Sequence, residues 1–281
     1  MTQNDLNAEG QAADATANGK YAPVNGLNMY YEIHGSGEPL ILLHGGVIPS
    51  GVLGANLEEL VKHRQVITPH MQAHGHTRDI DRPLRTETMA DDIAALIAHL
   101  GLAQVDLMGY SMGGGVALQT AIRHPALVRK LVVVSTAMRH SAWYPEVRPR
   151  FEEMHTNAAQ LAAGLKQSPL AELYPDADWE LIFTKLGEMV SRDHDWSEQV
   201  AGITAPTMLV FADADSILPE HMVEFYRLLG GGRRDAGLDG SLRPAAHLAI
   251  VPGTTHYTIM STAQVAQLVE PFLSAPLLEA R

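Results

Sequence analysis

Six short, mostly apolar runs between residues 40 and 251 constrain the fold of this chain more than any other feature. They are Leu40–Leu43, Val66–Ile67, Val105–Met108, Leu131–Val134, Met208–Phe211 and Leu248–Val251. Runs of this kind are typical of strands that are covered on both faces, as in a parallel sheet. Between the runs, apolar residues recur at helical spacing, as at Ile93, Ile97 and Leu100. Strand and helix therefore alternate along the chain.

This alternation predicts an α/β protein with an open, mostly parallel central sheet and helices on both of its faces. In such sheets the ligand site lies beyond the carboxyl ends of the strands. Residues 27–33 follow an alternating pattern. Met29, Tyr31 and Ile33 lie on one face, and the residues between them, Asn28, Tyr30 and Glu32, lie on the other. We expect this segment to be a half-exposed strand at an antiparallel edge of the sheet.

Residues 136–202 interrupt the alternation. They contain no convincing strand pattern, but they hold all three tryptophans, Trp143, Trp179 and Trp196, and stretches compatible with helix. We therefore expect a helical lid at 136–202, inserted into a core that consists of residues 23–135 and 203–281. An aromatic lid favours a mainly apolar substrate of modest size. Residues 230–244 contain three consecutive glycines and a mixed run of charges, which predicts a long surface loop.

The first residues, 1–22, are expected to form a flexible tail. They are rich in Ala, Asn and Asp, and they lack both the basic start and the apolar stretch of a secretory signal. Cytoplasmic residence is the default expectation for such a chain. Because no apolar run approaches the roughly 18–20 residues that cross a bilayer, we expect no membrane association.

Composition excludes several classes of function. The chain is 46% apolar and 19% charged, which is typical of a folded globular protein. Its 32 acidic residues outnumber 20 Lys and Arg, for a formal net charge of −12, and no basic cluster is present, so nucleic acid is not an expected partner. The chain has no cysteine, which excludes thiolate catalysis, disulfides and cysteine metal sites.

The strongest chemical signal is the pentapeptide Gly109-Tyr110-Ser111-Met112-Gly113. It follows directly on the apolar run that ends at Met108 and precedes a helical stretch, residues 114–124. A serine in such a strand–turn–helix junction has a strained backbone that exposes its hydroxyl, and the flanking glycines remove side chains that would collide. Ser111 is therefore the candidate nucleophile.

Acyl transfer also needs donors for the developing oxyanion, and backbone N–H groups are the usual supply. The strand at Leu40–Leu43 ends in the small-residue turn His44-Gly45-Gly46, whose glycines allow close approach of a substrate. We assign the N–H groups of Gly46 and Met112 to the oxyanion hole. For His44 we expect hydrogen bonds within its own loop.

A serine nucleophile requires a base, and the base requires a third group that holds it in the right tautomer. His256 is preferred because the segment Pro252–His256 directly follows the last apolar run and emerges at the same sheet edge as Ser111. Two candidate acids, Asp213 and Asp215, leave the carboxyl end of the preceding strand.

These motifs resemble the α/β-hydrolase superfamily over about residues 25–273. The resemblance rests on the glycine turn after His44, the elbow around Ser111, the pair Asp213 and Asp215 followed by Pro219, and His256, in the order serine, acid, histidine. In members with this pattern the second aspartate is the triad acid. The resemblance therefore implies Asp215 as the acid and Asp213 as a residue that stabilises the turn.

Residues 70–77, His-Met-Gln-Ala-His-Gly-His-Thr, depart from the pattern Asp-x-x-Gly-His-Gly-x-Ser that the family usually has there. The departures at His70, Ala73 and Thr77 put the local loop geometry in doubt. Without the family, His70, His74 and His76 could instead be metal ligands, because imidazoles at such spacing can converge on zinc. No nearby residue completes a familiar metallohydrolase set, so we expect neither a metal nor a cofactor.

The serine at the elbow disfavours the haloalkane dehalogenases and epoxide hydrolases of this fold, which attack with aspartate. The resemblance implies hydrolysis of small to medium, mainly apolar carboxylic esters through an acyl-enzyme, so the expected partner is a small-molecule ester. Amide, lactone or C–C bond hydrolysis stay open, as does perhydrolysis by haloperoxidase-like members, whose elbow resembles Gly113-Gly114-Gly115. A binding module with a degenerate site is the alternative from another class, and no oligomeric state is predicted.

Overall fold

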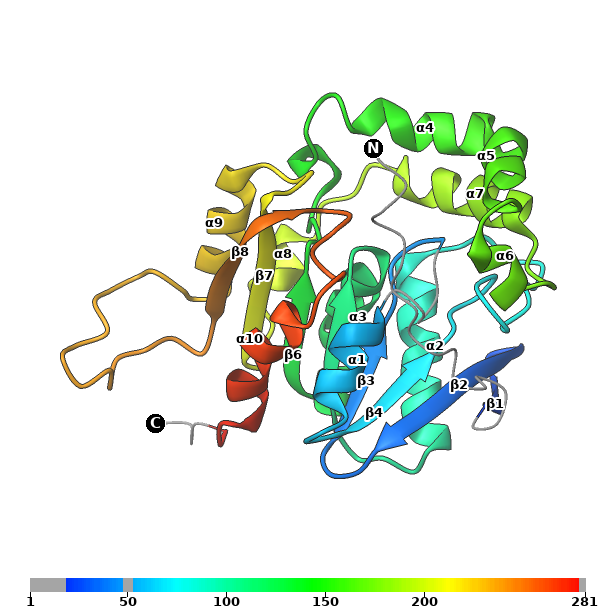
Figure 1. Ribbon diagram of the computed structural model, residues 1–281. Helices are drawn as coiled ribbons and strands as arrows, with labels where there is room; N and C mark the ends of the chain where they lie inside the picture. Colours follow the sequence, from blue (N-terminus) through cyan, green and yellow to red (C-terminus); the bar gives the residue numbers. More distant parts are fainter. Residues whose placement is uncertain (1–18, 48–52, 278–281) are drawn as a thin grey trace.

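The computed structural model describes residues 19–47 and 53–277, and these form one eight-stranded sheet with helices on both faces (Figure 1). The strands are β1 (Lys20–Val24), β2 (Leu27–Gly35), β3 (Pro39–Leu43), β4 (Gln65–Pro69), β5 (Val105–Tyr110), β6 (Val128–Val134), β7 (Thr207–Ala214) and β8 (His247–Thr255). Across the sheet their order is β1-β2-β4-β3-β5-β6-β7-β8. β3 to β8 run parallel, whereas β1 and β2 are antiparallel to their neighbours. The predicted α/β architecture is confirmed.

Helices cover the sheet in two layers and also lie above its upper end in Figure 1. They are α1 (Gly54–Leu60), α2 (Thr86–His99), α3 (Met112–Arg123), α4 (Arg148–Thr156), α5 (Ala158–Leu165), α6 (Pro169–Leu173), α7 (Trp179–Val190), α8 (Ser197–Val200), α9 (Pro219–Leu228) and α10 (Gln264–Ser274). Apolar residues of α1 and α10 share one buried cluster, and those of α2, α3 and α9 share another. Within the described ranges, no helix has both the length and the apolar character needed to cross a membrane.

The two buried clusters lie on opposite faces of the sheet because side chains alternate along a strand. In β3, Leu40 and Leu42 belong to the cluster that includes α1 and α10, whereas Ile41 and Leu43 belong to the cluster that includes α2 and α3. All four side chains are at most 1% exposed. A central strand buried on both faces needs apolar residues at every position, which explains its uninterrupted apolar run.

The amino-terminal edge of the sheet differs from expectation. The predicted tail reached residue 22, but Lys20–Val24 form β1 and pair with β2; residues 1–18 of that tail lie outside the described residues. Asn25 and Gly26 join the two strands, with φ angles of 47° and 88°. Positive φ at both central residues is the geometry of the tight hairpin turn that Asn-Gly favours. β1 is thus the edge strand, and β2 is an internal strand rather than an edge.

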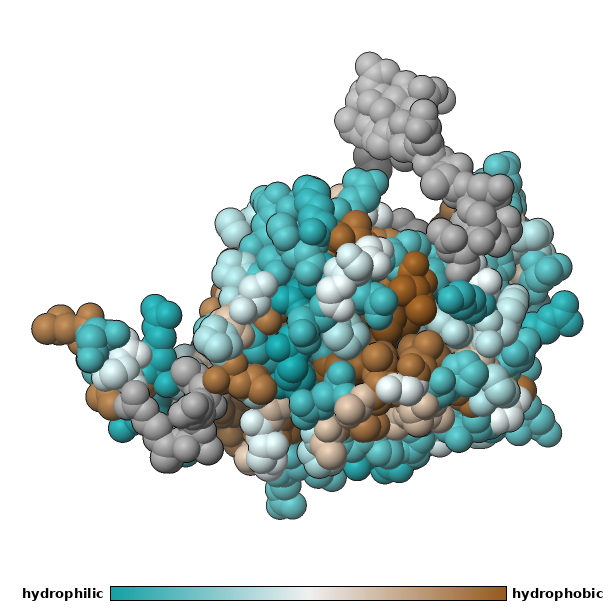
Figure 2. Space-filling view, turned by 90° about the horizontal axis from the view of Figure 1, so that it is seen from below, coloured by the Kyte–Doolittle hydropathy of each residue, from teal (hydrophilic) through white to brown (hydrophobic). Residues whose placement is uncertain are grey.

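The opposite edge also differs from expectation. β8 was predicted as a strand covered on both faces, but it forms the outer edge of the sheet and its Ile250 is 45% exposed. The irregular segment between α9 and β8 corresponds to the predicted surface loop, 230–244, and projects to the left in Figures 1 and 2. Figure 2 shows hydrophobic residues at the end of this projection. Leu238, which belongs to this segment, is fully exposed.

The segment predicted as a lid contains α4, α5, α6 and α7, between β6 and β7, and these helices lie at the top of Figure 1. A buried cluster that includes Trp179, Ile182 and Phe183 joins these helices, and Ala73 of the core also belongs to it. Lys185 on α7 fixes them to the core, because its Nζ lies 2.5 Å from Asp79 Oδ2 and donates to the carbonyl oxygen of Arg82 at 2.9 Å.

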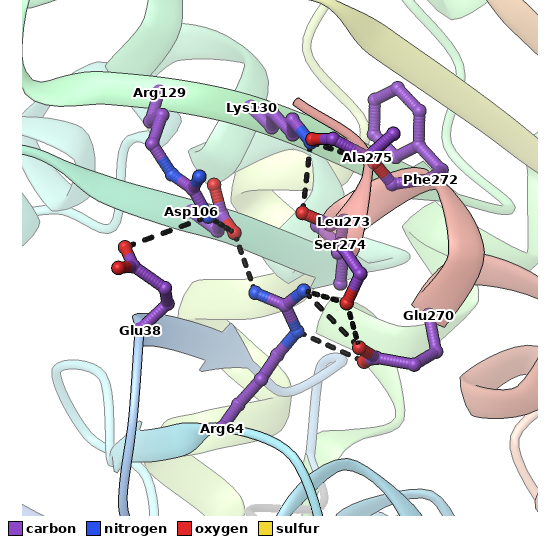
Figure 3. Close-up of polar contacts among 10 residues, drawn as sticks. All are labelled: Glu38, Arg64, Asp106, Arg129, Lys130, Glu270, Phe272, Leu273, Ser274 and Ala275. Atoms are coloured by element: carbon purple, nitrogen blue, oxygen red, sulfur yellow. Dashed lines mark hydrogen bonds and ion pairs between the residues drawn. The ribbon is translucent and has the colours of Figure 1, made fainter. Parts of the chain in front are cut away.

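A network of charged side chains ties the start of β5 and β6 to the end of α10 (Figure 3). Asp106 on β5 is fully buried, and its Oδ2 accepts hydrogen bonds from Arg64 at 2.9 Å and from Arg129 at 2.5 Å. Arg64 also bonds to Glu270 on α10 at 2.9 Å. Buried Lys130 donates to the carbonyl oxygens of Phe272 and Leu273, both at 2.8 Å, and to that of Ala275. A lysine therefore caps the negative end of the α10 dipole.

Lys130→Met should destabilise the fold, because it leaves the carbonyl oxygens at the end of α10 without their buried donor. We expect the free energy of unfolding to fall by about 3 kcal/mol, the range for losing charged hydrogen bonds to buried groups. Chemical denaturation measures this loss. The control Lys62→Met removes an exposed lysine and should change the free energy of unfolding by less than about 0.5 kcal/mol. Equal stability of the two variants would contradict the prediction.

Candidate active site

Ser111 stands at a sharp turn between β5 and α3. Its φ and ψ angles are 52° and −116°, outside the ordinary regions for a residue with a side chain. A Cβ on Gly109 would lie 2.1 Å from the carbonyl oxygen of Gly113, and a Cβ on Gly113 would lie 2.4 Å from that of His44. Both glycines are therefore required by close backbone approach, as the sequence pattern predicted.

The structure brings the three predicted triad side chains into one chain of hydrogen bonds. Ser111 Oγ lies 3.0 Å from His256 Nε2, and His256 Nδ1 lies 3.0 Å from Asp215 Oδ1. Asp215 and His256 are 8% and 6% exposed, so the pair is screened from water. With Nδ1–H donating to the carboxylate, Nε2 carries the lone pair that can remove the proton of Ser111.

Asp215 is held as a carboxylate by several donors. Burial by itself would raise its pKa, but the bonds from His256 and from the Ser135 hydroxyl, at 2.6 Å, lower the pKa below its usual value. The N–H groups of Ala212 and Ser216 also donate to it, at 3.1 and 2.8 Å. The sequence analysis did not identify Ser135. This residue comes directly after the end of β6 and has a positive φ angle of 47°. No local motif marks this residue.

Asp213, the other candidate acid, points elsewhere. It is exposed, and its two carboxylate oxygens accept the N–H groups of Gly253 and Thr254 at 2.9 and 3.0 Å. These bonds hold the end of β8 just before His256. Asp213 thus has the place of a residue that stabilises the turn, and the histidine meets Asp215.

Tyr110 is a second residue that the sequence analysis did not identify, and it stabilises the backbone of His256. The Tyr110 hydroxyl donates to the carbonyl oxygen of His256 at 2.6 Å, and burial raises the pKa of this hydroxyl. Trp143 packs edge-on against the imidazole, with ring centroids 5.3 Å apart. These contacts restrict the orientation of the His256 ring.

The proposed oxyanion residues, Gly46 and Met112, line the same cavity as Ser111. His44 makes hydrogen bonds around its own loop: its Nδ1 lies 2.7 Å from the carbonyl oxygen of Gly45, and its Nε2 accepts the N–H of Met71 at 3.1 Å. The next residue of the turn, Val47, donates its N–H to His74 Nε2 at 3.2 Å. Imidazoles therefore fix the backbone of this glycine turn.

The cavity beside Ser111 measures about 400 Å³ and is walled mainly by aromatic, aliphatic and methionine side chains. Trp143 and Trp196 line it, whereas Trp179 and Phe183 lie in the core of the lid segment. Neither Lys, Arg, Asp nor Glu is among its described lining residues. The cavity is suited to an uncharged, mainly apolar group.

Residues 70–77 form a turn stabilised by its own histidines. His70 Nδ1 accepts the N–H of His76 at 3.0 Å, and His74 Nδ1 lies 2.8 Å from the carbonyl oxygen of Gln72. With both nitrogens of His74 used by the protein backbone, this ring has no lone pair to offer a metal. In the described part of the chain, His, Asp and Glu residues form no group of three that could hold a metal ion.

Burial also makes stability depend on pH. Desolvation lowers the pKa of His70 to about 3, and those of His74 and His221 to about 4, from an ordinary value of 6.5. Between pH 6.5 and 4 the unfolded chain therefore binds more protons than the folded chain, so the free energy of unfolding falls as the pH falls. Each histidine contributes up to about 1.4 kcal/mol per pH unit in this window.

Thermal unfolding measured between pH 7.5 and 4 should show this loss. His221→Gln keeps an acceptor for the Met138 N–H, which His221 Nε2 accepts at 3.2 Å, but cannot titrate. Its Tm should therefore fall less steeply below pH 6.5 than that of the wild type. His63→Gln changes an exposed histidine and should leave the slope unchanged. If Tm fell equally steeply with pH in all three proteins, buried His221 would not be a source of the pH dependence.

Several known proteins with similar sequences are named as hydrolases or esterases, and one is named as a non-heme haloperoxidase. Residues 38–175 match the model of the alpha/beta hydrolase fold family. The 2-hydroxymuconate semialdehyde hydrolase of Pseudomonas sp. (strain CF600) is 39% identical over 108 residues, a match that covers 37% of this chain and only 38% of that enzyme. The pimeloyl-[acyl-carrier protein] methyl ester esterase of Yersinia enterocolitica is 26% identical over 272 residues, 87% of this chain and 96% of that one. A thermophilic esterase from Thermogutta terrifontis superposes with a TM-score of 0.71 at 21% identity, over 92% and 98% of the two chains, and shows the shared fold.

Proposed function

Because this chain belongs to the α/β-hydrolase superfamily and is a hydrolase, we propose that it cleaves carboxylic esters of small to medium, mainly apolar acids through an acyl-enzyme on Ser111. The observation that carries the proposal is the alignment of Ser111, His256 and Asp215 at the wall of an apolar cavity. The near-full-length match to an enzyme named as a methyl ester esterase supports ester hydrolysis.

In the proposed mechanism, Ser111 Oγ attacks the ester carbonyl carbon while His256 Nε2 takes the hydroxyl proton. Negative charge develops on the carbonyl oxygen, and the N–H groups of Gly46 and Met112 stabilise it. His256 then returns the proton to the leaving alcohol, which leaves Ser111 acylated. Water attacks the acyl-enzyme by the same route, and Asp215 stabilises the imidazolium in both steps.

The experiment that tests this proposal is the hydrolysis of p-nitrophenyl esters from acetate to decanoate, with and without EDTA. A cavity of about 400 Å³ should accept short and medium chains and reject the longest ones. Activity that depends on chain length and is indifferent to EDTA supports the proposal. Activity that is lost to EDTA would assign the chemistry to a metal site instead.

C–C bond hydrolysis is the second candidate, because the Pseudomonas relative is named for a muconate semialdehyde. Muconates carry carboxylates, and a buried carboxylate requires a cation or hydrogen-bond donors. The described cavity lining supplies no Lys or Arg, which favours neutral esters. Faster turnover of 2-hydroxymuconate semialdehyde than of every p-nitrophenyl ester would reverse this order.

A further inference from the structure

The cavity extends beyond Ser111 along the first turn of α3. Gly115 lies one helical turn from the nucleophile, since its N–H donates to the Ser111 carbonyl oxygen at 3.1 Å. A Cβ on Gly115 would lie 3.3 Å from Thr86 and 3.8 Å from Trp196, so these side chains flank it closely. The rise of an α-helix places this end of the cavity about 6 Å from Ser111 along the helix axis. We call the part lined by Thr86, Gly115, His194 and Trp196 the distal end.

Aromatic rings line the cavity at both ends. Near the nucleophile, Trp143 packs against His256, and Phe151 lies edge-on to Trp143 with ring centroids 5.2 Å apart. At the distal end, His194 lies over Trp196 with centroids 4.4 Å apart and an interplanar angle of 34°. Such walls favour a flat ring in the substrate, because aromatic pairs gain more than their buried area alone provides.

His194 presents a hydrogen-bond acceptor at the distal end. Its Nδ1 lies 3.3 Å from the carbonyl oxygen of Arg192, so Nδ1 carries the ring proton. Burial lowers the pKa of this imidazole, which keeps it neutral and leaves a lone pair on Nε2. No described residue is hydrogen-bonded to Nε2.

Thr86 supplies a hydroxyl at the same end of the cavity. Its Oγ1 lies 4.0 Å from the sulfur of Met189, which is a weak hydrogen-bond acceptor. The Thr86 hydroxyl can therefore turn to donate to an oxygen of a bound ligand instead. The other hydroxyls of the cavity wall are committed elsewhere or belong to the nucleophile end: Tyr110 donates to the His256 carbonyl oxygen and Thr136 to that of Ser111, whereas Ser111 and Tyr257 both lie beside the His256 ring. Thr86 and His194 are therefore an available donor and acceptor at one end of an otherwise apolar cavity.

We propose that the distal end binds a hydroxyl group on an aromatic ring of the substrate, which donates to His194 Nε2 and accepts from Thr86 Oγ1. This inference rests on the proposed function, because the ring belongs to the acyl group that Ser111 takes up. A 4-hydroxyphenylacetyl group has the required form: its carbonyl stands at one end of the ring and its hydroxyl at the other. The substrate class is thus esters of hydroxylated arylalkanoic acids.

The test is a binding measurement that does not depend on turnover. Ser111→Ala protein is titrated calorimetrically with methyl 4-hydroxyphenylacetate and with methyl phenylacetate, which differ only by the hydroxyl. We expect the hydroxylated ester to bind roughly tenfold more tightly, the value of one net hydrogen bond in a buried site. Adding His194→Phe or Thr86→Val should bring the ratio of the two Kd values close to one.

His155→Phe is the matched control, because it changes an exposed histidine on α4 and should preserve the tenfold ratio. Thermal unfolding confirms that each variant is folded, and the two substitutions test the distal end independently. Equal binding of the two esters, or a ratio that survives both His194→Phe and Thr86→Val, would overturn the inference. Hydrolysis of methyl phenylacetate by the wild type is measured separately, so a failure of the proposed function is distinguished from a failure of hydroxyl recognition.

Discussion

Replacing Ser111 with alanine should lower kcat/KM for p-nitrophenyl esters by a factor of roughly 10⁴ to 10⁶, the loss found when a triad nucleophile is removed. The physical reason is that in the proposed mechanism Oγ forms the covalent bond to the acyl group, and alanine has no atom that can replace it. Substrate binding should persist, because the cavity wall is otherwise unchanged. Initial rates at saturating and limiting ester concentrations measure both effects.

His256→Ala should cause a similar loss, and the double variant should lose no more than either single variant. Ser111 and His256 act as a unit, since Oγ and Nε2 are 3.0 Å apart and neither promotes acyl transfer without the other. Ser261→Ala changes an exposed serine and should keep full activity. Losses that multiply in the double variant would mean that the two residues act independently.

Asp215→Asn should lower kcat by roughly 10⁴-fold while preserving the fold. The asparagine can present its NH₂ group to His256 Nδ1, which favours the tautomer with the proton on Nε2. That tautomer has no lone pair directed at Ser111 Oγ, which lies 3.0 Å from Nε2. Measuring kcat for one ester, with Tm as the folding control, tests this prediction.

Asp213→Asn is the matched control for Asp215→Asn. The Asp213 carboxylate accepts the backbone N–H groups of Gly253 and Thr254, and an asparagine keeps one acceptor oxygen. We therefore expect less than about a tenfold loss of kcat, from a small displacement of His256. A larger loss in Asp213→Asn than in Asp215→Asn would reverse the assignment of the acid.

The sheet could be predicted from the sequence wherever a strand is buried on both faces. The runs at β3, β6 and β7 are uninterrupted and apolar because helices cover both sides of those strands. The edges could not be predicted in the same way. β1 falls within a polar segment and contains Pro23, and β8 has an apolar run although its Ile250 is 45% exposed. Edge strands receive less burial, so their composition carries less information about where they lie.

Asp106 shows another limit of the apolar pattern. It lies within β5, where a fully buried carboxylate is costly unless it is paired. Its partners Arg64 and Arg129 come from a loop and from β6, 42 and 23 residues away in the chain. Burial raises the pKa of Asp106 even beside these cations. Only long-range packing reveals why this strand tolerates an acid.

In the candidate site, too, some residues could be recognised from local sequence and others could not. Ser111, with glycines two residues before and after it, could be recognised from sequence because backbone strain at the turn restricts which residues fit. The choice of Asp215 over Asp213 needed the family resemblance, and the hydrogen bond to His256 Nδ1 now supports it geometrically. Ser135 and Tyr110 carry no local signal, because each acts on a residue far from it in the chain.

The sequence by itself determined the class of the fold, the strained elbow and the residue types for acyl chemistry, because apolar periodicity and glycine requirements are local properties of the chain. Only the tertiary structure decided which residues hold the Asp215–His256 pair in place, which strands form the edges and which aromatic residues face the cavity. Those outcomes depend on contacts between residues separated by 40 to 150 positions, as for Asp215 with His256 and Tyr110 with His256. Packing in three dimensions sets such contacts, and no local pattern encodes them.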